Sequence, residues 1–341
     1  MPRNKVTIYD IAKELTVTPS TVSRALSNHP RISTKTKEAV RAVAERLNYQ
    51  HNGIAAALRS GNTHIIGVMI PTVNRSFFSS VIRGIEQVSR EAGYNVMITQ
   101  SNDSEEVERS NVETMLRTQV DGVIASIARE TTDYSHYQKV IEEKIPLVLF
   151  DRVTEISNAS TVVIDDYLGA YKATEHLIKQ GFKRIAHFAG KLHLNIYKYR
   201  LRGYREALEH YGIHFDENLV HVSNVQLEDG KEGMDYLLNL SNPPDAVFAA
   251  SDYSAIGAMQ VLKKRKIKIP EEIALVGFAD EPSAAYVEPP LTSVNKMSEK
   301  MGQFADKIFL EQIKNKAKLS IPTKTVLTPK LIIRSSSQTK T

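Results

Sequence analysis

The chain has 341 residues, of which 42% are hydrophobic and 24% are charged, so it is long enough to form two or three folded domains. It contains no cysteine, which excludes disulfides, thiol catalysis and cysteine-based metal sites. The net charge of +5 is uneven: residues 1–61 carry +6 and the other residues carry −1. A polyanion partner for the first sixth of the chain and an ordinary solvated surface explain this charge about equally well.

Three short helices are predicted before Ser60. The first covers about residues 7–15. The second begins after Thr18, a good N-cap, with Pro19 at the first helical position, where a missing N–H has no cost. The third covers about residues 34–47. Two short helices joined by a tight turn and braced by a third are typical of a helix-turn-helix DNA-binding unit. A three-helix bundle used for protein contacts is the alternative.

The second predicted helix has one polar face. Ser20, Ser23, Arg24 and Ser27 recur at the spacing i, i+3, i+4, i+7, which places them on one side of a helix. Small hydroxyl side chains allow a close approach to DNA, and an arginine can form a bidentate pair with guanine. This face is therefore the predicted DNA-reading surface.

An alanine-rich segment links this head to the rest of the chain. Asn52 can cap a short helix over residues 53–58. Isolated helices of this length are marginal in water, so a flexible tether is the alternative.

The stretches TVSRAL, ISTKT, LNYQHN and AAALRSG, at this spacing, resemble the lactose-repressor family of bacterial transcription regulators. The resemblance implies a helix-turn-helix domain at 1–50, a hinge helix at 51–61, and an effector-binding and dimerisation domain at 62–341. It also implies a homodimer on a pseudo-palindromic operator in double-stranded DNA, with Leu58 wedged into the minor groove. No heptad-repeat extension follows the body, which favours a dimer over a tetramer.

The expected DNA contacts are Ile8, Tyr9, Thr18, Pro19, Ser20, Thr21, Ser23, Arg24, Ser27, Arg31, Ser33, Tyr49, Asn52, Ala55 and Leu58. One residue of the head departs from the family pattern. Thr16 occupies the turn where the family usually has glycine, and a β-branched residue is costly at positive φ.

From Ile65 onward, apolar runs alternate with amphipathic helices. The runs start near residues 65, 94, 122, 145, 184, 220, 246 and 273. Such alternation predicts buried parallel sheets, here as two Rossmann-like lobes resembling periplasmic sugar-binding proteins. The lobes are expected at about 62–162 plus 292–322, and about 163–291 plus 323–336. The fold class is thus an all-α head and hinge followed by an α/β body.

Ligands in this architecture lie between the lobes, at the carboxyl ends of the strands. The resemblance implies effector contacts at Phe77, Phe78, Asp151, Asn195, Arg200 and Asp252. Many members have an aspartate directly after the eighth apolar run, but this chain has Ala279 there and Asp280 next. Asp280 is therefore a further candidate. Helix capping and core packing are the alternative roles for these residues.

No phosphate-binding loop, metal-ligand spacing or nucleophile elbow is present, so we expect no enzyme activity, catalytic residue, metal or cofactor. The chain has neither a signal-peptide pattern nor an apolar run of membrane-spanning length, so we expect a cytoplasmic protein without a membrane partner. The predicted function is a ligand-responsive, sequence-specific repressor of carbohydrate-utilisation genes, with a sugar or sugar derivative as effector. A soluble sugar-binding protein without DNA function is the alternative.

Overall fold

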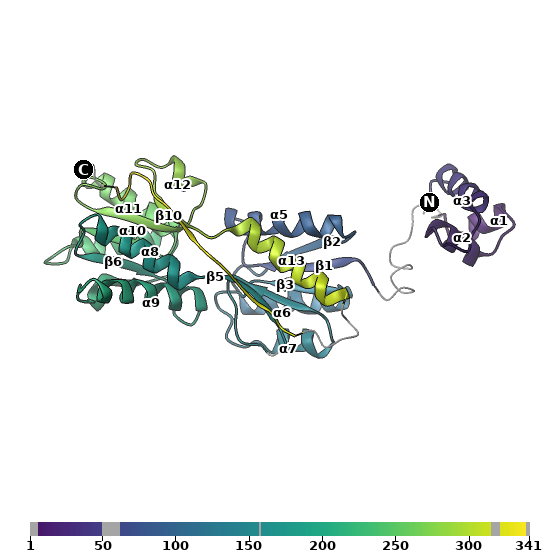
Figure 1. Ribbon diagram of the computed structural model, residues 1–341, viewed down its shortest axis with the longest axis horizontal. Coiled ribbons are helices and arrows are strands. Elements are labelled where there is room, and N and C mark those ends of the chain that lie inside the picture. The colour runs from purple at the N-terminus through teal and green to yellow at the C-terminus, as the bar shows by residue number, and fades with distance from the viewer. Residues whose placement is uncertain (1–5, 50–61, 157, 315–320, 339–341) are drawn as a thin grey trace. The chain divides into compact units, whose positions relative to one another are not determined.

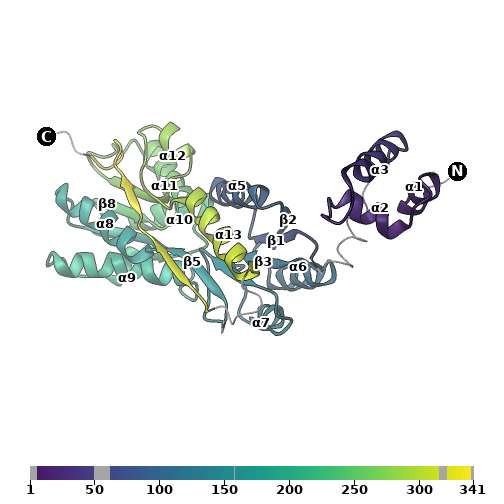
Figure 2. The same cartoon turned by 45° about the vertical axis from the view of Figure 1, so that its right-hand side comes forward.

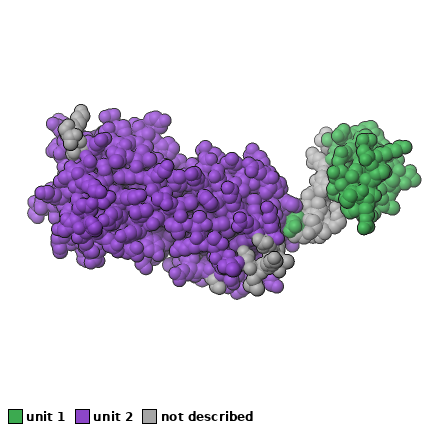
Figure 3. Space-filling model, in the orientation of Figure 1, with its two compact units in different colours: residues 1–63 green, residues 64–341 purple. Residues whose placement is uncertain are grey.

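The computed structural model describes residues 6–49, 62–156, 158–314 and 321–338 of the chain (Figure 1). The chain forms two compact units, residues 1–63 and residues 64–341 (Figure 3). Each unit has its own core, so each is described by itself. The segment expected to form the hinge, 51–61, lies outside the described residues, which resume at Asn62.

Three helices make up the described part of the first unit: α1 (Ile8–Glu14), α2 (Pro19–Leu26) and α3 (Thr34–Arg46). Their apolar faces meet in one small core built around Ile11, Val22 and Val40, each with 0% exposure. These are the predicted helices, with ends within about one residue of the predicted ones. The periodic apolar residues therefore do what their spacing indicates, which is to bury one side of each helix.

Local hydrogen bonds fix where the first two helices begin. The Thr7 backbone N–H donates to Asp10 Oδ2 at 2.8 Å, and the Thr7 hydroxyl donates to the same oxygen at 2.8 Å. Thr18 Oγ1 accepts from the backbone N–H of Thr21 at 3.2 Å, with Pro19 as the first helical residue of α2. Both caps satisfy N–H groups that a helix start leaves without an intrahelical partner.

Thr16, in the turn between α1 and α2, has a φ of +53°. The turn closes through a hydrogen bond from Val17 N–H to the Ala12 carbonyl at 3.0 Å. This left-handed conformation is the one that glycine adopts without steric cost, whereas the branched Cβ of threonine makes it unfavourable. The helix-turn-helix turn therefore keeps its sharp form in spite of the residue that occupies it.

Replacing Thr16 with glycine should stabilise the head by about 0.5–1 kcal/mol, because relief of the steric strain exceeds the added entropy of the unfolded chain. Hydrogen exchange of α1 and α2 amides in the full chain measures this local free energy. The matched control is Thr36→Gly in α3, where the backbone is helical, and this change should destabilise the head. If amide exchange in Thr16→Gly is no slower than in the wild type, or if both variants change exchange equally, Thr16 is not strained.

The first sheet of the body has the strand order β11-β5-β4-β3-β1-β2. All its described pairs are parallel. The strands are β1 (Ile65–Ile70), β2 (Asn95–Gln100), β3 (Gly122–Ala125), β4 (Leu147–Phe150), β5 (Ser160–Ile164) and β11 (Lys324–Leu327). Helices α5 (Ser76–Glu91) and α13 (Ser298–Lys314) share one core with this sheet, and α6 (Glu105–Arg117) and α7 (Ser135–Glu142) share another.

The second sheet has the order β12-β10-β9-β8-β6-β7 and is parallel except for the antiparallel pair β10–β12. Its strands are β6 (Ile185–Ala189), β7 (Val220–Val222), β8 (Ala246–Ala249), β9 (Ala274–Ala279), β10 (Thr292–Asn295) and β12 (Lys330–Ile332). Its helices are α8 (Asp166–Lys179) and α9 (Asn195–His210) around one core, α10 (Leu227–Leu238) and α11 (Asp252–Lys264) around another, and the short η1 (Glu217–Leu219) and α12 (Ser283–Tyr286).

The chain crosses between the two lobes at three places: from β5 to α8, from β10 to α13, and from β11 to β12. Figures 1 and 2 both show the yellow C-terminal segment passing along the body from one lobe to the other. Three connections allow the lobes to change their separation while remaining attached, as in hinged ligand-binding proteins.

The predicted α/β body is present, and its eight predicted strands are β1 to β4 and β6 to β9. Four further strands, β5, β10, β11 and β12, were not among these eight predicted runs, and each contains polar residues beside its apolar ones. These strands shift the expected lobe limits. Residues 292–295 pair in the second sheet instead of the first, and residues 324–327 pair in the first sheet instead of the second.

None of the helices in the described ranges is both long enough and apolar enough to cross a membrane.

Candidate functional site

A cavity of about 410 Å³ lies between the two lobes of the body, where the carboxyl ends of strands from both sheets meet. Sites at this edge of parallel sheets are typical for small ligands. Its lining includes, from the first lobe, Arg75, Phe77, Phe78, Asp103, Arg129, Asp151 and Arg152, and from the second, Tyr197, Arg200, Gln226, Tyr253, Phe278, Ala279, Glu281 and Lys296.

A buried ion pair forms the wall of the cavity on the second lobe. Arg200 Nε donates to Asp166 Oδ1 at 2.8 Å, and Arg200 Nη2 lies 2.7 Å from the same oxygen. Arg200 Nη1 donates to the Ala250 carbonyl at 2.7 Å, and its guanidinium lies 3.7 Å from the ring centre of Phe278. Burial raises the pKa of Asp166 to about 6, although the arginine opposes the shift. The pair fixes the N-terminal half of α9 against the start of α8.

A second buried ion pair joins the two lobes. Lys296, which follows β10, places Nζ 2.5 Å from Asp151 Oδ1 at the end of β4. The same ammonium lies 3.5 Å from the ring centre of Phe77. Burial lowers the pKa of Lys296, and the nearby Asp151 carboxylate counteracts it. One face of the Phe77 ring is therefore covered by a cation, which leaves less aromatic surface for stacking than the sequence indicated.

Asn195, the first residue of α9, also bridges the lobes. Its Nδ2 donates to the Asp151 carbonyl at 3.0 Å, and its Oδ1 accepts from the Val153 N–H at 3.0 Å. Both hydrogen bonds tie the second lobe to the backbone after β4. The side chain does not line the interlobe cavity and instead lines a separate hollow of about 910 Å³.

Glu281 extends a carboxylate across the cleft from the second lobe. It accepts from the Ser76 N–H at 3.2 Å, at the first turn of α5, and also from the Ser76 hydroxyl. An anionic group is favourable at a helix N-terminus. Asp252 holds Glu281 in place from behind: its carboxylate accepts from the Glu281 N–H at 2.7 Å and from the Ser293 hydroxyl at 2.5 Å. Burial raises the pKa of Asp252 to about 7.

The loop after β9 turns Asp280 away from the cavity. Asp280 pairs with Arg334 at 2.7 Å and accepts from Asn295 Nδ2 at 2.8 Å. Ala279 and Asp280 have φ values of +132° and +53°, so two successive non-glycine residues are in the left-handed half of φ space. This backbone places the small Ala279 side chain, and then Glu281, at the cavity.

One acid and two arginines form the far corner of the cavity on the first lobe. Asp103, after β2, lies 2.5 Å from Arg152 Nη1 and 3.5 Å from Arg129 Nη1. Burial raises the pKa of Asp103, but Arg152 and Arg129 outweigh this effect and hold it below its ordinary value. The corner is therefore ionised and carries one more positive than negative charge.

On the head, α2 and its C-cap present the predicted polar face. Ser20, Arg24 and Ser27 are exposed, and the Ser27 hydroxyl donates to the Arg24 carbonyl at 3.2 Å. Tyr9 is 68% exposed on α1. Among the other expected DNA contacts, Thr18, Arg31 and Ser33 are exposed, Pro19, Thr21 and Ser23 are half-buried, and Ile8 and Tyr49 pack partly against the head core. Asn52, Ala55 and Leu58 lie outside the described residues.

Comparison with known proteins identifies both units. Residues 7–52 match the family model "Bacterial regulatory proteins, lacI family", and residues 174–337 match "Periplasmic binding protein-like domain". The chain is 33% identical, over 98% of its length and 98% of the relative's, to the HTH-type transcriptional regulator DegA of Bacillus subtilis (strain 168). The chain belongs to the lacI family.

Other members support the same assignment. The ribose operon repressor of Haemophilus influenzae (strain ATCC 51907 / DSM 11121 / KW20 / Rd) is 31% identical over 91% of this chain and 92% of its own length. The solved structure of a transcriptional regulator CelR–cellobiose complex has a TM-score of 0.74 at 29% identity and covers 97% of this chain and 99% of its own. As a lacI-family member, the chain is a DNA-binding and effector-binding transcription regulator and not an enzyme.

The seven effector contacts expected in this lacI-family chain separate into two groups. Phe77, Phe78, Asp151 and Arg200 line the interlobe cavity, whereas Asn195, Asp252 and Asp280 do not. The last three act behind the lining, where they bridge the lobes or fix the loop after β9. Position along the sequence places a residue near a strand end, but it does not determine which way the side chain points.

The lining also holds polar and charged residues that were not among the sequence candidates, including Arg75, Asp103, Arg129, Arg152, Tyr197, Gln226, Tyr253, Glu281 and Lys296. Asp103 and Arg129 follow predicted strands, so the rule that identified Asp151 could also have found them. Lys296 had no such signal, because it follows the unpredicted strand β10.

Arg200→Met should lower the free energy of unfolding of the body by about 3 kcal/mol, because it leaves the buried Asp166 carboxylate without its partner. Adding Asp166→Asn should recover at least half of this loss, since no charge then remains. Urea unfolding of the full chain measures both. The control Arg202→Met, on the exposed side of the same helix, should cost less than about 0.5 kcal/mol. A double variant no more stable than Arg200→Met would show that the pair is not the source of the loss.

Proposed function

We propose that this lacI-family chain is a homodimeric repressor of carbohydrate-utilisation genes, with its effector bound in the interlobe cavity. Residues 1–50 form the DNA-binding domain, 51–61 the hinge, and 62–341 the effector-binding and dimerisation domain. Each head binds one half of a pseudo-palindromic operator. The assignment of the hinge, with Asn52, Ala55 and Leu58, is taken from the family resemblance, since these residues are not described.

The cavity carries the proposal, because its lining comes from both lobes. A ligand there contacts Arg75 and Asp151 of the first lobe together with Arg200 and Glu281 of the second. Binding energy can then favour one lobe separation over another, which is the differential affinity that a ligand-controlled switch requires. A ligand site within a single lobe would give no such coupling.

Two of the similar proteins support a carbohydrate effector. One relative is a ribose operon repressor and one similar structure is a cellobiose complex. Hydroxyl groups of a sugar would find acceptors in Asp103, Asp151 and Glu281, which line this cavity.

Exposed apolar side chains on edge strands are consistent with a homodimer. Ile98 on β2 is 43% exposed and Val222 on β7 is 53% exposed, and each strand ends its sheet. Exposed apolar side chains on sheet edges are common where another chain binds.

Selection of binding sites from random DNA, with the full chain and with residues 62–341 alone, tests the function. The full chain should select a pseudo-palindromic sequence at physiological salt, and the headless chain should select none. Sedimentation of the selected complex should give two chains per operator. If the full chain has no preference over random DNA, the repressor proposal fails, and a sugar-binding protein without DNA function becomes the better description.

Arg24→Ala should weaken binding to the selected operator by about 1–3 kcal/mol, mainly through one base position. Fluorescence anisotropy on the operator and on variants with single base changes measures this effect. Arg41→Ala, an exposed arginine on α3, is the control and should weaken binding to all sequences alike. Equal losses on every sequence for Arg24→Ala would mean that Arg24 contacts only phosphate.

A further inference from the structure

The charges lining the interlobe cavity indicate the chemical class of its ligand. This inference rests on the proposed function, because it concerns the same effector site. We propose that the effector is a carbohydrate derivative with an anionic group, a carboxylate or a phosphate, and that Arg129 and Arg152 receive this group beside Asp103.

The arginine corner has too few carboxylates for its cations. Arg129 and Arg152 share the single carboxylate of Asp103, and all three side chains are at most 19% exposed. Arg152 Nε is buried and has no hydrogen-bond partner among the described residues. A partly compensated buried charge is unfavourable, and an anionic group in the cavity would offset it.

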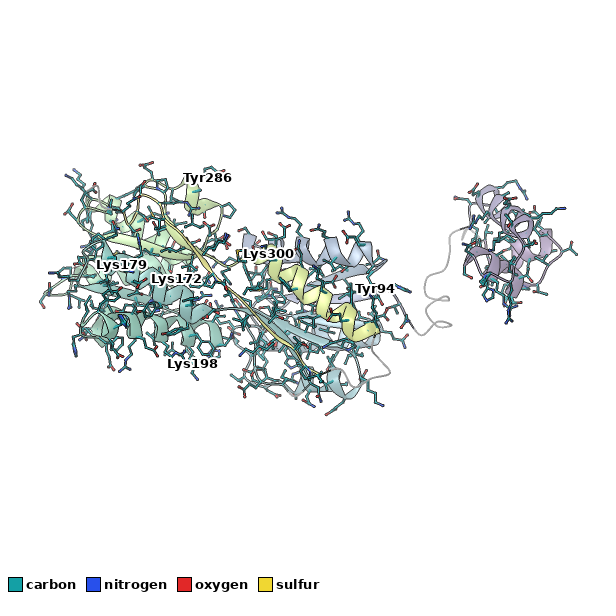
Figure 4. The ribbon with its side chains drawn as sticks, viewed as in Figure 1. Tyr94, Lys172, Lys179, Lys198, Tyr286 and Lys300 are labelled. Atoms are coloured by element: carbon teal, nitrogen blue, oxygen red, sulfur yellow. The ribbon has the colours of Figure 1, made fainter. Side chains whose placement is uncertain are left out.

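The lining as a whole also has more positive than negative side chains. Five cationic side chains line the cavity, but only three carboxylates line it. When Asp166, which pairs with Arg200 from behind, is added to these carboxylates, the lining cations still outnumber them by one. Arg75 forms no ion pair within the described residues; it donates to the Gln226 amide and stacks 3.4 Å above the ring centre of Tyr253. Lys172, Lys179 and Lys198, labelled on α8 and α9 in Figure 4, are not among the residues that line this cavity.

The corner is also held rigidly, as an anion site requires. Arg129 lies in the loop between β3 and α7, and two carboxylates of α6 hold this loop. Glu108 accepts from the Ala128 N–H at 2.5 Å and from the Thr131 hydroxyl at 2.8 Å, and Glu105 accepts from the Thr132 N–H at 2.8 Å. Asp103 Oδ1 accepts from the Arg129 N–H at 3.0 Å. The guanidinium groups are therefore pre-organised, which lowers the entropy lost when a ligand binds.

The cavity lining also contains the carboxylates of Asp103, Asp151 and Glu281, which would repel a ligand that is negatively charged throughout. Glu281 reaches across the cleft from the second lobe and accepts from Ser76, and the Asp151 carboxylate pairs with Lys296. A carboxylate accepts hydrogen bonds from sugar hydroxyls, so the neutral part of the ligand should lie near these two carboxylates. The anionic group should lie at the Asp103 corner.

The test uses the full chain and inorganic phosphate as the anion probe, with chloride at equal ionic strength as the reference. Phosphate should raise the unfolding temperature of the body because it binds the folded state. Arg152→Gln and Arg129→Gln should each reduce the apparent affinity about tenfold, and Asp103→Asn should increase it, because it removes the competing carboxylate. Arg117→Gln, an exposed arginine on α6, is the matched control and should change nothing.

Phosphate also stabilises proteins by exclusion from their surface, and that effect does not depend on single arginines. Equal stabilisation of all four variants and the wild type would overturn the proposal. The Arg129→Gln variant keeps the test valid if Arg152→Gln does not fold, because Arg129 is the more exposed of the two.

A second arm distinguishes the two anion sources and separates this proposal from the proposed function. Calorimetry compares glucose with glucuronate and glucose 6-phosphate, and ribose with ribose 5-phosphate. Tighter binding of an anionic member by at least tenfold, lost in Arg152→Gln, supports the proposal and identifies carboxylate or phosphate. Tighter binding of a neutral sugar, unchanged in Arg152→Gln, overturns the anionic class but leaves the repressor function intact. Failure of operator selection would instead remove the repressor function and leave the anion site.

Discussion

The body depends on charges that are buried where its two lobes meet. Asp151 pairs with Lys296 across the lobes, and Asp166 pairs with Arg200 inside the second lobe. Neither pair needs to add much to stability, since the cost of desolvating two ions nearly offsets their attraction. Their effect is geometric: because each charge must have its partner, the Asp166–Arg200 pair fixes α9 against α8, and the lobe separation that keeps Asp151 with Lys296 is strongly preferred. A ligand that supplies other partners can change that preference.

The loop after β9 illustrates how one departure from the family pattern is accommodated. Ala279 replaces the usual aspartate, and the next acid, Asp280, is bound to Arg334. The acid that enters the cavity is Glu281, which is held there by the buried carboxylate of Asp252. The acid at the cavity is therefore two residues further along the chain than the resemblance predicts, and it reaches the first turn of α5. This shift changes the shape of the site more than its charge.

Much of the architecture could be predicted, because it follows from local patterns. The head helices follow from apolar spacing and from the caps at Thr7 and Thr18, and the central strands follow from continuous apolar runs. The two strands at one end of each sheet escaped prediction, and one of their pairings, β5 with β11, joins residues over a hundred positions apart. The direction of a side chain after a strand also escaped prediction. Asp252 and Asp280 follow strands as Asp151 does, but tertiary partners turn them away from the cavity.

The central claim is that the cross-lobe contacts set the separation of the lobes. The chain has no cysteine, so spin labels can be placed cleanly at Glu113→Cys on α6 and Glu232→Cys on α10. Pulsed electron resonance then measures the distance distribution between the lobes in the full chain. The account predicts one narrow distribution that becomes broader or longer when Lys296→Met and Glu281→Gln remove the bridging charges. An unchanged distribution in that variant would contradict it.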